Sequence, residues 1–398
     1  MTNIAILGFG VVGGGVADLI TNNKKEVEAL GGDEINIKYI LDLRDFPGSP
    51  FEKKVVHDYN LIVNDESVDV VIELMGGSHP AYEYTVAALK AGKHVISSNK
   101  EVVANFGDEF LSIAKENGVT YRFEAAVGGG IPVISPMISF VKQNKLSEIR
   151  GILNGTTNYI LTKMFTFGDS FESALKDAQE RGYAEKNPDA DVLGLDAARK
   201  ICILGAIASG KLVSPDNIHV EGITKIRSED VKSVEKIGAS IKLVGRCIIE
   251  NGALKHVLVA PFVIAKDEAL AGVSGVYNAV EAVGEPLGNV MFYGRGAGAG
   301  ATASAVVGDL MQIMRTGAQY AEPSFEKTAE ISDFGSFECK NYIALEKGLQ
   351  NEVKSLFGDV RFIESEECAF VTAPLSEAEV NEKLSKLSRQ PFSRIRLL

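Results

Sequence analysis

The chain lacks the features of membrane proteins and of most nucleic-acid-binding proteins. It contains no run of about 18 apolar residues that could cross a bilayer as a helix. No basic segment followed by an apolar one opens the sequence, so we expect a cytoplasmic protein without an export signal. Acidic residues outnumber basic ones by 53 to 41, and the resulting net charge of −12 argues against nucleic acid or an anionic membrane as a partner.

Cysteine and histidine are too few and too scattered for a disulfide framework or a zinc site. The cysteines form no C-x-x-C pair and no zinc spacing, which is typical of buried thiols in a reducing compartment. The histidines show no paired spacing either, so we expect each of them to be structural. These residues are Cys202, Cys247, Cys339 and Cys368, and His57, His79, His94, His219 and His256.

Tryptophan is absent, whereas glycine is abundant, with 40 residues in a chain of 398, which indicates many tight turns. This length implies two or three domains with apolar cores.

In "NIAILGFGVVGGGVADLI" a G-x-G-x-x-G turn separates an apolar run from a helical pattern, which is typical of a dinucleotide site. A glycine-rich turn without a ligand is the alternative. The residues expected at the cofactor are Gly8, Phe9, Gly10, Val11, Val12 and Gly13.

Alternating strands and helices follow this turn. Strands of Val, Ile and Leu that alternate with helices predict a parallel sheet covered on both faces, as in a Rossmann domain. Ligands of such sheets bind at the carboxyl ends of the strands, where Gly76, Gly77, Ser97, Lys100 and Glu124 are expected. The predicted strands are 37–42, 68–77, 94–99 and 121–127, and the predicted helices are 80–91 and 106–117.

The end of the second strand leaves both NAD and NADP open as cofactors. Asp42 stands where an acid would bind the 2′-hydroxyl of the ribose of NAD. Arg44 lies two residues later, and Lys53 and Lys54 follow. Because basic residues here favour the 2′-phosphate, the sequence favours NADP, with Arg44 and Lys53 at the phosphate.

The alternation stops near Pro132, and the pattern changes to that of an α+β domain with a mixed or antiparallel sheet. A glycine-rich loop with Gly296 and Gly298 then enters a helix that extends to about residue 316. The start of this helix suits an anion, and the loop could close over the nicotinamide. The predicted elements are helices 132–143, 156–166, 170–181 and 195–209, and strands 218–226, 241–250, 254–264 and 288–296.

The stretch "RGYAEKNPDADVLGLDAARK" (181–200) concentrates carboxylates before a lysine and admits three interpretations. Asp196 and Lys200 lie one helical turn apart, which is often a solvated ion pair. A calcium loop is unfavourable, because its fifth and twelfth positions are Leu193 and Lys200. The third interpretation is a pocket for a substrate ammonium, with a lysine for proton transfer. Asp196 alone would make Lys200 a poorer base, but burial or a second cation, such as Lys100, would offset this effect.

Taken together, these segments resemble homoserine dehydrogenase over nearly all of residues 1–320. The segments "GFGVVGGGV", "SSNKEVVA", "EAAVGGGIP", "NGTTNYIL", "RGYAEKNPDADVLGLDAARK" and "GRGAGAGATASAVVGDL" occur in the order of that family, and the fourth and fifth are the most specific. The resemblance implies the reversible NAD(P)H-dependent reduction of L-aspartate 4-semialdehyde to L-homoserine, a step of threonine and methionine biosynthesis. No kinase-like segment precedes it, so a monofunctional enzyme is expected.

The resemblance also implies roles for individual residues. Lys200 resembles the catalytic lysine of the family, and Asp196 its partner. Lys100 resembles the lysine that lies near both the nicotinamide and the substrate. The other residues implied are Gly182 at the cofactor, and Glu185 and Asp191, besides Asp196, at the substrate.

Two turns have both a structural and a functional interpretation. In "NGTTNYIL", Thr156 is a candidate helix cap, or the hydroxyls of Thr156 and Thr157 bind the substrate carboxylate. Glu124 resembles the carboxylate of a sodium site at the domain hinge, or it only closes a tight turn. The sodium ligands implied besides Glu124 are the backbone carbonyls of Val127, Gly129 and Ile131.

The C-terminal segment predicts a small module of strands 341–346, 360–364, 368–373 and 392–397 with helices 349–357 and 376–388. The order β-α-β-β-α-β is ferredoxin-like, and with "LEKGLQNEV" it resembles an ACT-type regulatory domain. That likeness implies feedback by an amino acid such as threonine; a dimer-building cap without a ligand is the alternative. The expected domains are 1–131 with helix 300–318 for the nucleotide, 132–299 for the substrate and a homodimer or homotetramer interface, and 322–398 for regulation.

Two other classes of function remain open in the sequence. One is another Rossmann dehydrogenase of an amino or hydroxy acid, and the other is a nucleotide-sensing regulator without catalysis. The Asp196–Lys200 pair argues against a pure sensor, which has no use for a proton donor. Cys202 lies on an apolar helical face and is interpreted as a core residue. Since no loop cysteine is available as a nucleophile, simple hydride transfer is favoured over thioester chemistry.

Overall fold

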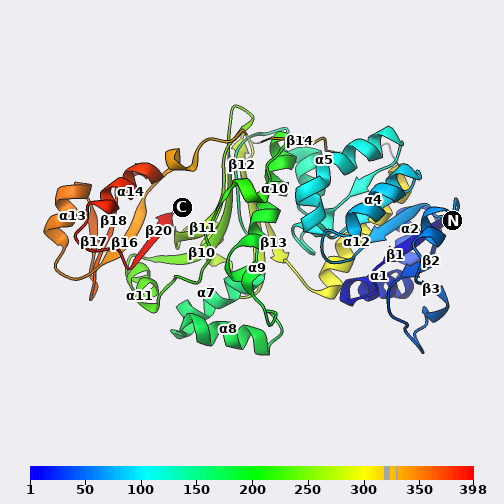
Figure 1. Ribbon diagram of the computed structural model, residues 1–398, viewed down its shortest axis with the longest axis horizontal. Coiled ribbons are helices and arrows are strands. Elements are labelled where there is room, and N and C mark those ends of the chain that lie inside the picture. Colours follow the sequence, from blue (N-terminus) through cyan, green and yellow to red (C-terminus); the bar gives the residue numbers. More distant parts are fainter. Residues whose placement is uncertain (318–322, 329) are drawn as a thin grey trace.

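The N-terminal part of the chain forms a six-stranded parallel sheet in the order β3-β2-β1-β4-β5-β6. The computed structural model describes residues 1–317, 323–328 and 330–398, and Figure 1 shows its ribbon. The strand order is that of a Rossmann fold, which confirms the predicted class. The elements are β1 (Thr2–Leu7), β2 (Ile35–Leu41), β3 (Val55–Val56), β4 (Val70–Glu73), β5 (His94–Ser97), β6 (Tyr121–Arg122), α1 (Val11–Asn22), α2 (Lys24–Gly31), α3 (Asn60–Val63), α4 (Ala81–Lys90) and α5 (Lys100–Glu116).

Burial on both faces of this sheet explains its nearly continuous apolar strands. In β1, Ala5 and Leu7 pack with residues of α4 and α5, whereas Ile4 and Ile6 belong to a second cluster with α1. A helix from far along the chain, α12 (Ala299–Thr316), completes the second cluster and packs against α1 and α2. The expected end of this helix at residue 318 lies outside the described residues, as does residue 322, the expected start of the C-terminal domain.

The middle of the chain folds into a sheet whose central strands are antiparallel, in the order β13-β12-β7-β10-β11, with helices packed against one face. The predicted α+β pattern is therefore confirmed. Its elements are α6 (Ile134–Pro136), a π-helical turn (Met137–Val141), β7 (Lys145–Ile152), α7 (Gly155–Phe167), α8 (Phe171–Glu180), α9 (Asp189–Val192), α10 (Leu195–Ser209), β9 (His219–Val220), α11 (Ser228–Lys236), β10 (Ala239–Glu250), β11 (Ala253–Ala265), β12 (Tyr277–Glu285) and β13 (Gly288–Arg295).

Three of the predicted elements are corrected by the structure. Helix α5 begins at Lys100 and not at 106, because the side chain of Asn99 accepts hydrogen bonds from the first-turn amides. The strand predicted at 121–127 ends at Arg122, and residues 124–126 form a 3-10 turn. The strand predicted at 218–226 is reduced to β9, because the chain then turns toward α9. Strands β7 and β12 were not predicted.

The C-terminal residues form the predicted order of four strands and two helices, and their sheet continues the central one. The strands lie in the order β20-β16-β18-β17, with antiparallel neighbours, and β20 pairs in parallel with β11. Figure 1 shows this module at the opposite end of the molecule from the Rossmann unit. The elements are β16 (Asn341–Leu345), α13 (Gln350–Phe357), β17 (Arg361–Ile363), β18 (Cys368–Val371), α14 (Glu377–Ser385) and β20 (Ser393–Leu397), and the short pairs are β8 (Lys211–Leu212) with β14 (Glu326–Lys327) and β15 (Glu338–Cys339) with β19 (Leu375–Ser376).

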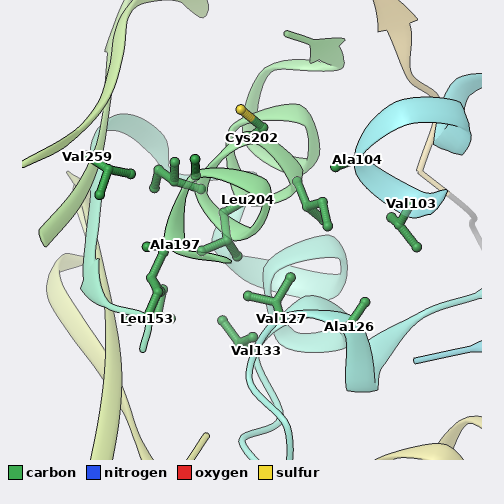
Figure 2. Packing of buried hydrophobic residues seen from close by; sticks show 14 of the residues in the cluster. Val103, Ala104, Ala126, Val127, Val133, Leu153, Ala197, Cys202, Leu204 and Val259 are labelled. Atoms are coloured by element: carbon green, nitrogen blue, oxygen red, sulfur yellow. The ribbon is translucent and has the colours of Figure 1, made fainter. Parts of the chain in front are cut away.

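Helix α10 occupies the centre of the apolar core, between the two larger sheets. Figure 2 shows its side chains, including Ala197 and Leu204, between Val103 of α5 and Val259 of β11. Cys202 is buried in the same helix, which confirms its interpretation as a core residue. The packing fixes α10 and therefore the polar residues near its beginning. Among the described residues, no helix is both long and apolar enough to cross a membrane.

Candidate active site

The glycine turn between β1 and α1 has the geometry that a dinucleotide requires. Gly8 has a φ of +93°, a conformation that side chains disfavour. A Cβ at Gly13 would lie 2.1 Å from the carbonyl oxygen of Gly8, so the helix can approach the strand only without a side chain there. A Cβ at Gly10 would meet no atom within 4 Å, so this side of the turn is open for a pyrophosphate.

The acid at the end of β2 is already paired. Asp42 Oδ2 accepts a hydrogen bond of 2.8 Å from the amide of Phe9, and Oδ1 lies 2.9 Å from Nε of Arg44. Hydrogen bonding to Arg44 holds the pKa of Asp42 well below its usual range. Lys53 is exposed, whereas Lys54 turns back and donates to the carbonyl of Ile37.

A buried carboxyl group that the sequence analysis missed organises the ends of β4 and β5. Glu73 is fully buried, and it accepts hydrogen bonds from the amide of Met75 (2.8 Å) and the hydroxyl of Ser97 (2.6 Å). Burial raises its pKa to about 7. The Ser97 hydroxyl in turn accepts from the amide of Asn99, the cap of α5, so Glu73 is linked to the start of the helix that carries Lys100. An acid inside an otherwise apolar strand, "VVIELM", was the available signal.

Lys200, Asp196 and Lys100 form a compact charged cluster. Lys200 Nζ lies 2.8 Å from Asp196 Oδ2 and donates to the carbonyl of Leu153 at 2.8 Å. Lys100 Nζ lies 2.6 Å from Asp196 Oδ1. Asp196 is 4% and Lys200 7% exposed, so their interpretation as a solvated surface pair is wrong.

Burial and charge act against each other in this cluster. Burial lowers the pKa of Lys200, the Asp196 carboxylate raises it, and the Lys100 ammonium lowers it again; the net direction is downward. Burial would raise the pKa of Asp196, but the charges of Lys200 and Lys100 hold it well below its usual value. The offsetting cation expected from the sequence is therefore present at Asp196.

Asn154 connects this cluster with the neighbouring acid. Its Nδ2 donates to Asp191 Oδ1 (2.7 Å) and to Asp196 Oδ2 (2.9 Å), while its Oδ1 accepts from the amide of Thr157. Asn154 is thus the cap of α7, and the prediction of Thr156 as the cap is wrong: the Thr156 hydroxyl donates to the carbonyl of Tyr183 at 2.7 Å. Burial raises the pKa of Asp191.

The cluster lies in the wall of a cavity of about 630 Å³ between the Rossmann unit and the central sheet. Other predicted site residues line the same cavity, namely Val12, Val127, Gly129, Thr156, Gly182, Glu185, Asp191, Gly296 and Gly298. Ser97 is buried and donates a hydrogen bond to Glu73, and its neighbour Ser98 lines the cavity instead. The remaining predicted cofactor residues, which are not among those lining it, are Gly8, Phe9, Gly10, Val11, Gly13, Arg44, Lys53 and Gly76.

The turn after β6 is closed by Glu124. Its Oε1 accepts from the amides of Val133 (2.7 Å) and Ile134 (2.8 Å), and Oε2 accepts from the amide of Ser135 (2.8 Å). The tight-turn role considered in the sequence analysis is therefore present. The described residues contain no group of three or more His, Cys, Asp or Glu side chains placed to hold a metal ion.

A dinucleotide turn and a buried lysine that contribute to one cavity define an NAD(P)-dependent oxidoreductase. Residues 132–311 match the sequence family described as homoserine dehydrogenase, and residues 8–124 match the NAD-binding domain described for the same enzymes. The chain belongs to the homoserine dehydrogenase family.

Individual relatives agree with this assignment. The chain is 42% identical over 316 residues to the homoserine dehydrogenase of Synechocystis sp., covering 78% of this chain and 73% of the relative. It is 34% identical over 412 residues to that of Bacillus subtilis, covering 97% and 94%. Among solved structures, a homoserine dehydrogenase from Thiobacillus denitrificans is similar with a TM-score of 0.91 and 31% identity, covering 100% of this chain and 98% of the other. An archaeal homoserine dehydrogenase in complex with NADPH has a TM-score of 0.66 and 27% identity, covering 78% and 97%.

Proposed function

We propose that the protein interconverts L-aspartate 4-semialdehyde and L-homoserine with NADP(H), and that Lys200 and Lys100 handle the proton. The observation that carries this proposal is the pairing of the buried Lys200 and Asp196 with the partly exposed Lys100, in the wall of the cavity that Val12 of the glycine turn also lines. Glu185 and Asp191 in the same wall suit the ammonium group of an amino-acid substrate.

The hydrogen bonds of Lys200 leave it one donor for the substrate. An ammonium group has three N–H bonds, and two of them are directed at Asp196 and at the carbonyl of Leu153. In the reducing direction, the remaining N–H polarises the aldehyde oxygen and delivers a proton as the alkoxide develops. Asp196 keeps the amine in place and holds Lys100 beside it. The nicotinamide, when bound, supplies the hydride.

In the oxidising direction, Lys200 has to accept the hydroxyl proton of homoserine. Burial and the neighbouring Lys100 lower the pKa of Lys200, so its neutral form becomes more accessible than that of a free lysine. Asp196 opposes this shift but fixes the direction of the amine. The same three residues therefore serve both directions.

NADP is the proposed cofactor, because Asp42, the acid expected at the 2′-hydroxyl of the ribose, is neutralised by its ion pair with Arg44. The residues fit a dinucleotide: the open side of Gly10 leaves room for the pyrophosphate, and the first turn of α1 offers amide donors. Asp42 is engaged by Arg44, whose side chain is 63% exposed, and Lys53 is exposed nearby in sequence. Arg44 and Lys53 would hold the 2′-phosphate.

The turn after β6 is also proposed as a site for sodium. Glu124, as a buried carboxylate, and the carbonyls of Val127, Gly129 and Ile131 offer only oxygen donors, which suit a hard cation. Glu124 Oε2 accepts one amide, so it keeps a lone pair for such an ion.

The C-terminal module is proposed to be an ACT-like regulatory domain, with threonine as its effector. Its β-α-β-β-α-β order and antiparallel sheet support this proposal. A homodimer through the outer strand β13 is proposed as well, since Met291 and Tyr293 on it are 39% and 53% exposed. We also propose the domain bounds given above. A cytoplasmic location is proposed because the four cysteines are free and buried, which suits a reducing compartment.

One set of assays of the purified protein tests these statements. L-Homoserine should drive the reduction of NADP faster than that of NAD, and other hydroxy acids should not. Sodium in place of choline should raise the rate, and threonine should lower it. Light scattering should give the mass of a dimer. Dinucleotide binding without turnover on homoserine would contradict the proposed activity.

A further inference from the structure

Glu101 and Arg199 are charged residues beside the Lys200–Asp196–Lys100 cluster, and the proposed reaction gives neither of them a role. Glu101 follows Lys100 in the first turn of α5, and Arg199 precedes Lys200 in α10. Arg199 Nη2 lies 3.6 Å from Glu101 Oε2, and the two side chains are 28% and 33% exposed. This ion pair therefore joins the same two helices as the 2.6 Å ion pair of Lys100 with Asp196.

The two ion pairs are arranged with opposite polarity on the two helices. On α5 the positive Lys100 stands next to the negative Glu101. On α10 the negative Asp196 and the positive Arg199 are three residues apart, so they lie on one face of the helix. A shift of α5 along α10 that exchanged the partners would bring like charges together at both contacts. The four charges therefore favour a single register, in which Lys100 meets Asp196.

Lys100 needs such a constraint, because its side chain is 39% exposed. A lysine has a long flexible stem, so its contacts decide where the ammonium group lies. Apolar packing also joins the two helices, and Figure 2 shows Val103 and Ala104 of α5 next to α10. This packing holds the helices together, but it is not directional. The register is left to the charged contacts.

Glu101 also contacts the loop after β4, which carries residues expected at the cofactor. The hydroxyl of Ser78 donates to Glu101 Oε1 at 2.7 Å. The carbonyl of Gly77, one residue earlier, accepts from Nδ2 of Asn99, the cap of α5, at 2.7 Å. The loop and the beginning of α5 are therefore fixed to each other. Through Glu101, the position of Lys100 is linked to the edge of the sheet where a dinucleotide is expected.

We propose that Glu101 and Arg199 are positioning residues for Lys100, an inference that rests on the proposed function. They hold α5 in the register in which the Lys100 ammonium meets Asp196. They act through Lys100 and do not touch the reacting atoms. Loss of the pair lets the ammonium group move away from the cluster, which lowers kcat while the glycine turn still binds the cofactor.

The test measures kcat for the oxidation of L-homoserine by NADP as a function of pH in Glu101→Gln, Arg199→Gln and the double variant. Each single variant should lower kcat by about 2–5-fold, the range that a partly exposed ion pair can supply. The double variant should lose no more than either single variant, because the two side chains act as one pair. The KM for NADP should stay unchanged in all three.

The pH profile separates positioning from a plain effect of charge. After burial, the Lys100 ammonium is what lowers the pKa of Lys200, against two neighbouring carboxylates. If Lys100 moves away, the pKa of Lys200 rises, so the increase of kcat with pH should shift to higher pH in both single variants. A Coulombic effect at a distance would instead lower this pKa in Glu101→Gln and raise it in Arg199→Gln. Shifts in opposite directions would overturn the proposal.

Arg389→Gln and Glu346→Gln are the matched controls, since these residues form an exposed ion pair of 3.4 Å in the C-terminal module. Without threonine, both controls should keep the wild-type kcat and pH profile. Unchanged turnover of the Glu101 and Arg199 variants, losses that multiply in the double variant, or a lower melting temperature with an unchanged pH profile would each overturn the proposal. A wild-type protein that does not oxidise homoserine at all would instead overturn the proposed function.

Discussion

Lys200 shows how a single residue acquires its chemistry from its surroundings. Lysine is a common surface residue, but here it is 7% exposed, with a carboxylate, a carbonyl and a second lysine as neighbours. Replacing it by methionine keeps the side-chain volume nearly constant and removes the amine. We expect Lys200→Met to lower kcat by about 10²–10⁴-fold, the usual contribution of general acid–base catalysis.

The measurement is steady-state turnover in both directions, together with the dissociation constant of NADP. Cofactor affinity should be nearly unchanged, because the glycine turn is intact. Lys211→Met, in β8 just beyond the same helix and exposed, serves as the control and should keep full activity. Full turnover of the Lys200 variant would rule out its catalytic role.

Glu73 predicts a pH dependence of stability with a definite sign. Its pKa is about 7 in the folded state, because the carboxyl group is buried, against about 4.3 in an unfolded chain. Between these values the folded protein holds a proton that the unfolded chain has released. The contribution of Glu73 to the free energy of unfolding is therefore fully present below about pH 4.3, and about 3 kcal/mol is lost as the pH rises to 7.

Glu73→Gln removes this dependence. Urea unfolding at pH 5 and pH 8 should show that the wild type loses stability, relative to the variant, at the higher pH. Glu66→Gln, the same replacement at an exposed position, should lose as much stability between pH 5 and pH 8 as the wild type does. An equal change in the free energy of unfolding between pH 5 and pH 8 for the wild type and the Glu73 variant would contradict the raised pKa of Glu73.

At the scale of elements, the β1–α1 unit separates folding from binding within one motif. Gly13→Ala would place a methyl group 2.1 Å from the carbonyl oxygen of Gly8, and we expect a loss of about 1–3 kcal/mol in the free energy of unfolding. Gly10→Ala meets no protein atom within 4 Å, so it should fold normally and lose affinity for the dinucleotide.

Gly14→Ala is the internal control for both changes. It lies inside α1 with open space around it, and should raise stability by about 0.5–1 kcal/mol, as alanine does in a helix. Chemical unfolding and a titration with NADP separate the three variants. Equal stability of the Gly13 and Gly14 variants would contradict the role of close packing.

The elements that could be predicted from the sequence are those whose pattern is local. Helix α10 begins and ends where its apolar periodicity places it, at 195 and 209, and the glycine turn follows its motif. Strands β7 and β12 escaped prediction, because Arg150 and Glu281 interrupt their apolar patterns. These two residues pair across the strands at 2.6 Å, and only the folded sheet brings them together.

The candidate site shows the same limit. Lys200 and Asp196 could be found because they are charged and one helical turn apart. Asn154 could not, since a neutral amide has no charge pattern, and its importance depends on Asp191 and Asp196, which are distant in sequence. The early start of α5 was likewise hidden in the side-chain hydrogen bonds of Asn99.

At the scale of the whole molecule, one buried arginine joins the C-terminal module to the central sheet. Arg396 of β20 is 4% exposed and bonds Glu377 of α14 at 2.8 Å and Glu221, just after β9, at 2.7 Å. We expect Arg396→Met to cost about 1–3 kcal/mol in the free energy of unfolding, because the buried Glu377 then keeps only Arg394, at 2.8 Å, of its two arginine partners.

Urea unfolding measures this loss, and the exposed pair of Lys386 and Glu382 offers the comparison. Lys386→Met should change stability by less than about 1 kcal/mol, since solvent screens its ion pair. Similar effects of the two variants would mean that the Arg396 junction does not hold the module to the sheet.

The return of α12 to the first sheet has a consequence for how the protein is made. Ile4, Ile6 and Val16 share their apolar cluster with Ala303, Val306 and Leu310, which leave the ribosome much later. During synthesis, the nascent nucleotide-binding unit therefore exposes apolar surface until α12 has been made and can cover it. A fragment that stops before residue 299 should therefore bind hydrophobic dyes and chaperones. A separately added peptide of residues 299–316 should reduce that binding.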